Sequence, residues 1–206
     1  MAFCMNKSCD RFRLLLFLPI AVVCVTLSAF QPGWAGSGVI YDPGGLKPVD
    51  SRTTLKVGDE APDFELKDLS GNTVTLSSFR GNKNVVLSFV PAAWTPVCSR
   101  QWPGYNIARD YFENNDAVVI GISVDNVPTL HAWVAEMGGL WFPVVSDFWP
   151  HGAVAKKYGI LRSDGTSERA LFVVDKKGTI RYTDVHDINK MPKLEHLIKA
   201  LENLEK

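Results

Sequence analysis

The fold is decided by residues 84–98, which read NVVLSFVPAAWTPVC. Asn84 to Val90 is an almost wholly apolar run, and its length is that of a strand buried on both faces of a sheet. A helix is expected to follow from about Val97 to Glu113, because apolar residues recur there at helical spacing. These apolar residues are Trp102, Tyr105, Ala108 and Phe112. A buried strand that leads directly into a helix is the unit from which α/β sheets are built.

Further elements on both sides of this unit predict the rest of the sheet. The strands and helices alternate, which predicts an α/β protein with parallel central strands, and a late hairpin adds antiparallel strands. The order predicts a thioredoxin-like fold with an N-terminal β-hairpin extension and a central mixed sheet flanked by helices. The expected elements are a hairpin around Ser70–Asn72, a strand at 117–124, a helix at 129–137, a short strand at 142–145, a short helix at 152–158, a hairpin of 170–174 with 179–182, and a closing helix at 192–205.

The first 35 residues differ from the rest. Basic residues precede the apolar run Leu14–Phe30, and small residues follow it up to Ala35, which is the pattern of an export signal. The run has 17 residues, close to the ~20 that span a bilayer, so an uncleaved membrane anchor is the alternative. Both interpretations predict that the remaining chain lies outside the cytoplasm, soluble or tethered. We expect residues 1–35 to be a signal peptide or anchor, 36–54 a linker and 55–206 the domain.

Charge and cysteine content limit the functions open to this domain. The 22 basic and 22 acidic residues give a net charge of zero, and no basic stripe indicates a nucleic-acid partner. Three of the four cysteines, Cys4, Cys9 and Cys24, lie in the signal region. The domain therefore retains Cys98 alone, which is typical either of a buried inert thiol or of a reactive one.

The position of Cys98 favours reactivity. Pro96 suits the first position of a helix, and Thr95 then stands where an N-cap belongs. Cys98 is thus expected in the first helical turn, where free N–H groups and the positive end of the helix favour the thiolate over the thiol. The alternative is a helix cysteine that is simply buried in the core.

The chain resembles the peroxiredoxins, the alkyl hydroperoxide reductase and thiol-specific antioxidant family. Pro91, Thr95 and Cys98 reproduce the P-x-x-x-T-x-x-C motif of that family, and residues 57–64, VGDEAPDF, look like its usual domain opening. Arg169 precedes LFVVD and matches the second active-site arginine of the family. Residues 146–154, SDFWPHGAV, are closest to the one-Cys, alkyl hydroperoxide reductase E type. The resemblance covers about residues 55–205.

The resemblance implies a role for each of these residues. Cys98 would attack a peroxide oxygen, Thr95 would orient the peroxide, Arg169 would stabilise thiolate and leaving oxygen, and Pro91 would shield the site from water. The implied partners are hydrogen peroxide or an alkyl hydroperoxide, an external thiol or thioredoxin-like reductant, and a second copy of the chain in a homodimer. The residues alone leave another possibility for Arg169, an ion pair with the neighbouring Glu168.

Two other functions remain as alternatives. An exported thiol-disulfide oxidoreductase needs C-x-x-C, but Thr95 occupies the position of the first cysteine. A non-catalytic thioredoxin-fold binding module, such as a copper carrier, needs paired ligands, and none of the four histidines has metal-ligand spacing with Cys98. We therefore expect no metal and no cofactor. Three aromatic residues, Trp94, Phe148 and Trp149, are candidates for an apolar collar that admits organic peroxides. Two of them, Trp94 and Trp149, are also candidates for a dimer contact near the Cys98 loop.

Overall fold

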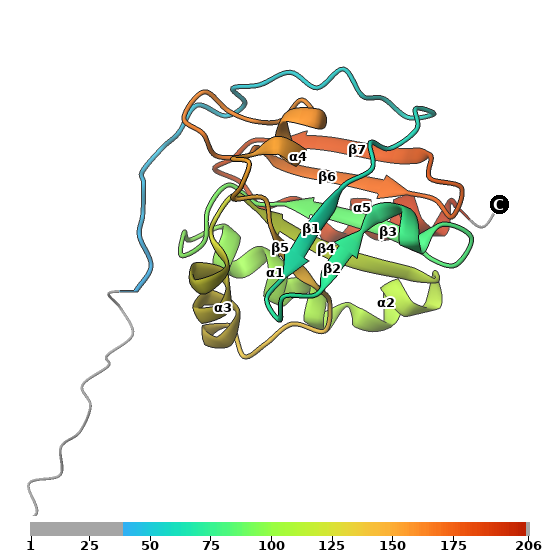
Figure 1. The fold of residues 1–206 in the computed structure, drawn as a ribbon, viewed down its shortest axis with the longest axis horizontal. Coiled ribbons are helices and arrows are strands. Elements are labelled where there is room, and N and C mark those ends of the chain that lie inside the picture. Colours follow the sequence, from blue (N-terminus) through green and yellow to red (C-terminus); the bar gives the residue numbers. More distant parts are fainter. Residues whose placement is uncertain (1–38, 205–206) are drawn as a thin grey trace, which may run out of the picture. The chain divides into compact units, whose positions relative to one another are not determined.

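The computed structural model describes residues 39–204. Its centre is a seven-stranded sheet in the order β2-β1-β5-β4-β3-β6-β7 (Figure 1). The central strands β3, β4 and β5 are parallel, whereas β6, β7 and the hairpin of β1 and β2 add antiparallel pairs at the two sides. The predicted thioredoxin-like fold with a mixed sheet and an N-terminal hairpin is thus confirmed. The strands are β1 (Glu65–Asp68), β2 (Thr73–Thr75), β3 (Asn84–Phe89), β4 (Ala117–Ser123), β5 (Val144–Ser146), β6 (Arg169–Val174) and β7 (Ile180–His186).

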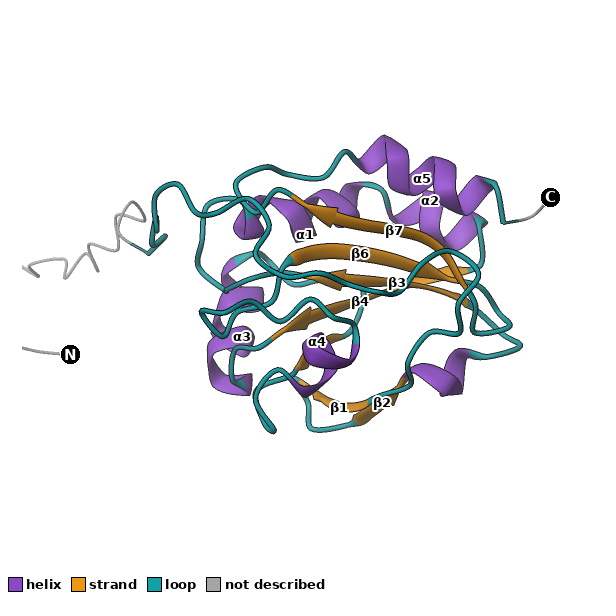
Figure 2. Ribbon diagram, turned by 90° about the horizontal axis from the view of Figure 1, so that it is seen from above, coloured by secondary structure: helices purple, strands orange, loops and turns teal. Residues whose placement is uncertain are grey.

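Helices cover both faces of the sheet. Figure 2 shows α1, α2 and α5 together on one side, and α4 on the other. Each strand side chain points to the face opposite its neighbour's, so in β3 Leu87 joins the core under α4 while Val86 joins the core under α1. This double burial explains why the β3 sequence is apolar at nearly every position. The helices are the 3₁₀ turn η1 (Leu76–Phe79), α1 (Cys98–Ile107), α2 (Arg109–Asn114), α3 (Val127–Glu136), α4 (Ala153–Lys157) and α5 (Leu194–Glu202).

The observed helices differ from the predicted ones by one or two residues at 129–137 and 152–158, and by more at two other places. The helix expected from Val97 to Glu113 is broken at Ala108, whose φ of −94° and ψ of 14° leave the helical range and separate α1 from α2. Apolar spacing continues through the break because both segments pack on the same core, so the pattern hides it. The closing helix is also shorter than residues 192–205, since Lys193 is its extended N-cap residue and Asn203 its C-cap residue.

The segment before the domain is more ordered than a linker. Residues 39–54, within the expected linker 36–54, run along the loops that precede β6 and follow β7 (Figure 1). The backbone N–H of Ile188 donates to the carbonyl oxygen of Pro48 at 2.9 Å, and Asp50 N–H donates to the Glu168 carboxylate at 2.6 Å. Composition predicted a linker because Gly, Pro and Ser are frequent there. The contacts that order the segment come from residues more than a hundred positions away.

The predicted signal peptide or anchor, including Leu14–Phe30, lies outside the described residues. Between residues 39 and 204, no helix combines the length and apolar character that crossing a bilayer requires.

Candidate active site

Cys98 lies at the junction of β3 and α1. Residues 90–97 connect the end of β3 to α1, and Cys98 is the first residue of that helix. The expectation that it stands in the first helical turn is confirmed by the structure. Its side chain is fully buried, at 0% exposure. The thiol is thus shielded from solvent at the end of the helix that carries the free backbone N–H groups.

The connecting loop departs from the predicted capping arrangement. Val97, not Thr95, is the N-cap residue, and Pro96 precedes it instead of occupying the first helical position. The Thr95 hydroxyl donates to the carbonyl oxygen of Ala92 at 3.0 Å and so fixes the loop on itself. Trp94 next to it has a φ of +62°, which is rare for a residue with a side chain. Such strain persists only where surrounding contacts enforce it, and it concentrates at functional sites.

Arg169 reaches Cys98 from the sheet. Arg169 begins β6, and the odd-numbered residues of this strand, such as Leu171 and Val173, face the core that also contains Cys98. Its Nη2 donates to Cys98 Sγ at 3.4 Å and to the carbonyl oxygen of Ile188 at 3.0 Å. A charge-assisted hydrogen bond from a buried guanidinium stabilises the thiolate form of the sulfur.

The alternative of an ion pair between Arg169 and Glu168 is wrong. Glu168 immediately precedes β6, and its carboxylate has other partners than Arg169. It is fully buried and pairs with Arg162, whose Nη1 lies 2.6 Å from Glu168 Oε2. The same carboxylate accepts the backbone N–H groups of Asp50 and Ser51. Glu168 therefore binds the N-terminal segment, while Arg169 donates a hydrogen bond to the thiol.

Gln101 completes a buried polar network that sequence reasoning missed. It lies one helical turn after Cys98, only 2% exposed, and its Oε1 accepts from Arg169 Nη1 at 2.6 Å. Its Nε2 donates to Tyr105 Oη at 3.1 Å and to Ser88 Oγ at 3.2 Å. The spacing of three and four residues along α1 was visible in the sequence, but the partner on β6 is 68 positions away. Gln101 thus fixes the guanidinium from the side opposite Ile188.

Aromatic packing holds α1 against the sheet. The indole N–H of Trp102 donates to Ser88 Oγ at 3.1 Å, and Gly121 on β4 leaves room for the ring. A Cβ at Gly121 would lie 2.9 Å from Trp102 Cζ2. Burial raises the pKa of Tyr105, which keeps its hydroxyl protonated within the network. The helix that carries Cys98 is therefore fixed by both apolar and polar contacts.

Arg169, whose Nη2 contacts Cys98 Sγ, lines a cavity of about 600 Å³, and Cys98 itself is not among the lining residues. Pro91, Thr95 and Arg169 all line it, so the structure brings the three residues predicted to accompany Cys98 to one site. Residues 41–46 of the N-terminal segment form part of its wall. The expected aromatic collar does not form at this cavity: Trp94 belongs to the connecting loop but is not among the lining residues, and Phe148 and Trp149 line a separate hollow next to β1.

Metal ligands do not gather anywhere in the described part of the chain, where no group of three His, Cys, Asp or Glu side chains is placed to bind an ion. The polar residues that line the cavity include one buried cation, Arg169, which contacts Cys98, and the hydroxyl-bearing Thr95, together with Asp42 and Asp164. The guanidinium and the hydroxyl are donors that suit an oxygen that gains negative charge.

Comparison with known proteins identifies the family of the chain. Residues 57–183 match the AhpC/TSA family. Alkyl hydroperoxide reductase E of Mycobacterium tuberculosis is 43% identical over 132 residues, which cover 64% of this chain and 86% of that protein. The structure of the mitochondrial 2-Cys peroxiredoxin of Plasmodium falciparum is 29% identical, with a TM-score of 0.65 over 73% of this chain and 94% of that one. A yeast mitochondrial 1-Cys peroxiredoxin, 22% identical, shares the fold, with a TM-score of 0.67 over 74% of this chain and 77% of that one.

Within the described residues, a thioredoxin-like sheet holds one thiol, at the start of a helix and beside a buried guanidinium, which is an arrangement typical of thiol-based redox proteins. The chain belongs to the AhpC/TSA family, the peroxiredoxins, which are thiol-dependent peroxidases.

Proposed function

We propose that this chain is a one-Cys peroxidase in which Cys98 reduces hydrogen peroxide and alkyl hydroperoxides. The observation that carries the proposal is the 3.4 Å hydrogen bond from Arg169 Nη2 to Cys98 Sγ at the start of α1. The thiolate attacks one peroxide oxygen, so that a sulfur–oxygen bond forms and the oxygen–oxygen bond breaks. The sulfur loses two electrons and becomes a sulfenic acid, while the other oxygen leaves and takes a proton to give water or an alcohol.

The surrounding residues have roles that follow from their chemistry. Arg169 stabilises the thiolate and then the negative charge that develops on the departing oxygen. Thr95 orients the peroxide through its hydroxyl, and Pro91, which has no N–H, lines the cavity without adding a donor. Since Cys98 is fully buried, the loop of residues 91–97 must open locally for peroxide to reach the sulfur.

Recycling by an external thiol follows from the cysteine count. Cys98 is the only cysteine in the described residues, and the other three lie within residues 1–35. The sulfenic acid therefore reacts with an outside thiol, releasing water and forming a mixed disulfide, and a second thiol restores Cys98. A small thiol or a thioredoxin-like protein is the reductant.

A cysteine series tests the one-Cys mechanism. The full chain with Cys4, Cys9 and Cys24 changed to Ser should retain turnover with an added thiol, and Cys98→Ser should abolish it. One equivalent of peroxide should add one oxygen to the mass of the triple variant, at Cys98. Loss of turnover in the triple variant would show that a second cysteine of the chain takes part. Turnover that survives Cys98→Ser would refute the assignment of the nucleophile.

The location and assembly of the chain are part of the proposal. The basic residues before Leu14–Phe30 support export, with the domain outside the cytoplasm either free or tethered by that run. An alkaline phosphatase fused after Ser37 should be active; a silent fusion would contradict export. A homodimer is expected by analogy with related peroxiredoxins, and sedimentation of the reduced protein as a monomer at micromolar concentration would exclude it.

A further inference from the structure

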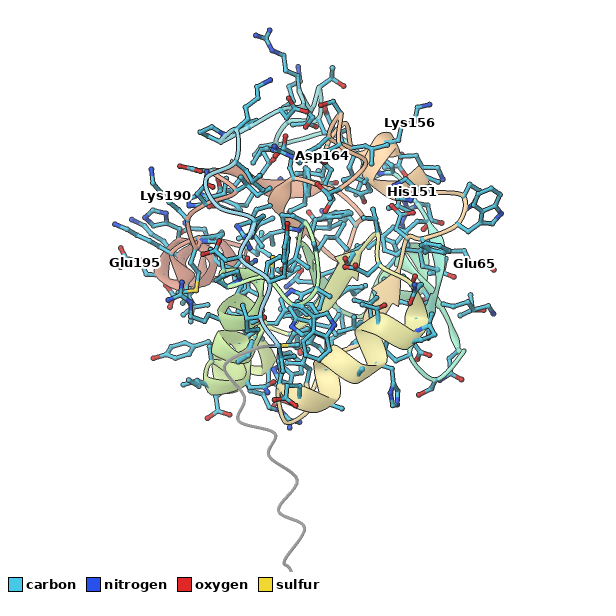
Figure 3. The ribbon with its side chains drawn as sticks, turned by 90° about the vertical axis from the view of Figure 1, so that its left-hand side faces the viewer. Glu65, His151, Lys156, Asp164, Lys190 and Glu195 are labelled. Atoms are coloured by element: carbon cyan, nitrogen blue, oxygen red, sulfur yellow. The ribbon has the colours of Figure 1, made fainter. Side chains whose placement is uncertain are left out.

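The N-terminal segment forms a wall of the active-site cavity, although it precedes the part of the chain that matches the family. The match begins at residue 57, whereas the cavity is lined by residues 41–46, here called the strap. Pro91, Thr95 and Arg169 line the same cavity from the domain side. Figure 3 faces this side of the molecule and labels Asp164 and Lys190, which belong to the two loops that the segment follows.

Hydrogen bonds fix the strap at both of its ends. The N–H of Tyr41 donates to the carbonyl oxygen of Trp94 at 2.8 Å, which ties the strap to the loop that leads to Cys98. The Asn189 side-chain oxygen accepts a hydrogen bond from the N–H of Leu46 at 2.8 Å, and its amide nitrogen donates to the carbonyl oxygen of Leu46 at 2.9 Å. The pair of bonds resembles that between neighbouring strands. Because hydrogen bonds hold the strap at both ends, its side chains line the cavity in defined positions.

Anchors beyond the strap keep it from sliding. Arg162 Nη2 donates to the carbonyl oxygen of Lys47 at 3.0 Å, and Glu168 accepts two backbone N–H groups from Asp50 and Ser51. Both anchoring side chains are buried and are paired with each other. Because Glu168 immediately precedes Arg169, the anchor of the strap and the cation at the thiol come from adjacent backbone positions.

The size and lining of the cavity indicate what it accommodates. Hydrogen peroxide, with two oxygen atoms, needs roughly 60 Å³ on the scale of the ~30 Å³ that a water occupies in the liquid. The cavity offers about 600 Å³, which is the size of sites that enclose small organic molecules, ~300–1,000 Å³. Its walls are largely apolar, with Pro43 and Leu46 from the strap opposite Pro96, Val97 and Ile188 from the domain.

We propose that the strap is a specificity-determining part of the site, which binds the apolar substituent of an organic hydroperoxide beside Cys98. The inference rests on the proposed peroxidase function and adds to it the segment that selects among peroxides. Contact with the strap is available only to a peroxide that carries an organic group. The strap therefore accelerates the oxidation of Cys98 by such a peroxide and not its oxidation by hydrogen peroxide.

The test compares second-order rate constants for oxidation of Cys98 in the full chain by cumene hydroperoxide and by hydrogen peroxide. Leu46→Ala should lower the ratio of the two constants about three- to tenfold, because it truncates an apolar wall. Replacement of residues 41–46 by alternating Gly and Ser, which keeps the chain length, should lower it at least as much. Val49→Ala is the matched control: it lies beyond the strap, does not line the cavity and should leave the ratio unchanged.

The outcomes distinguish a failure of the strap inference from a failure of the proposed peroxidase function. A fall in the ratio for both strap variants, with Val49→Ala unaffected, supports the inference. An unchanged ratio, or an equal loss with both peroxides, overturns it and leaves the peroxidase function standing. A wild-type chain whose Cys98 neither peroxide oxidises overturns the proposed function, and the inference with it.

Discussion

Replacing Gln101 by Met should loosen the guanidinium at the thiol while leaving the fold intact. Methionine has a similar length but none of the polar atoms, so three buried hydrogen bonds are lost, to Arg169, Tyr105 and Ser88. The bond to a charged donor is worth about 1.5–3 kcal/mol and each of the two neutral ones about 0.5–1.5 kcal/mol, so the free energy of unfolding should fall by about 2.5–6 kcal/mol. Proteins of this kind have about 5–15 kcal/mol in reserve, so the variant still folds.

The effect on reactivity follows from the position of Arg169. Without Gln101, the guanidinium retains only the carbonyl of Ile188 to hold it beside Cys98 Sγ. A loss of about 1.4 kcal/mol in transition-state stabilisation corresponds to a tenfold slower oxidation. Stopped-flow tryptophan fluorescence measures the oxidation rate, and urea denaturation measures the stability.

The control for Gln101→Met is Arg100→Met, which introduces the same side chain at the exposed neighbouring position of α1. It should change the oxidation rate less than twofold, a difference of about 0.4 kcal/mol. If Gln101→Met oxidised as fast as the wild type while losing stability, the network would support the core alone and not the position of Arg169.

Two further predictions concern the support of α1. Gly121→Ala should destabilise the protein by about 1–3 kcal/mol in urea denaturation, because the new Cβ meets the Trp102 ring. The control is Gly104→Ala, where a Cβ meets no atom within 4 Å and which should stabilise the protein by up to about 1 kcal/mol. Equal effects of the two substitutions would contradict the packing argument. Tyr105→Phe should cost about 0.5–1.5 kcal/mol, since the hydroxyl that accepts from Gln101 is lost, and a neutral result would mean that Gln101 is satisfied by Ser88 alone.

The sequence was sufficient to predict the parts of the molecule that depend on local pattern. The run from Val85 to Val90 predicts β3 because a strand buried on both faces needs apolar residues at almost every position. The proline and threonine before Cys98 predict a helix start, although the capping details are wrong. A hydroxyl such as that of Thr95 can serve either the helix or its own loop, and only the course of the loop decides between them.

Long-range contacts account for what the sequence did not predict. The partners of Arg169 are Cys98, Gln101 and Ile188, and no periodicity relates positions on β6, α1 and the loop after β7. The strap has the composition of a linker, and its order comes from single side chains of distant loops, Asn189 among them. Local propensity carries no information about such contacts.

The buried pair of Arg162 and Glu168 gives a last prediction, on how the N-terminal segment is held. Arg162→Met leaves the fully buried Glu168 carboxylate without a cation, and such an unpaired charge costs about 3–5 kcal/mol. Glu168→Gln should cost less, because the amide oxygen still accepts the N–H groups of Asp50 and Ser51, and Arg162 keeps the carboxylate of Asp164.

The double variant distinguishes pairing from packing in this cluster. Glu168→Gln added to Arg162→Met removes the orphaned charge, so the double variant should be more stable than Arg162→Met alone, as measured by urea denaturation. If the costs of the two substitutions added within about 0.5 kcal/mol, the residues would not be coupled. The two side chains would then hold the segment separately, each through its own hydrogen bonds to the backbone of Lys47, Asp50 and Ser51.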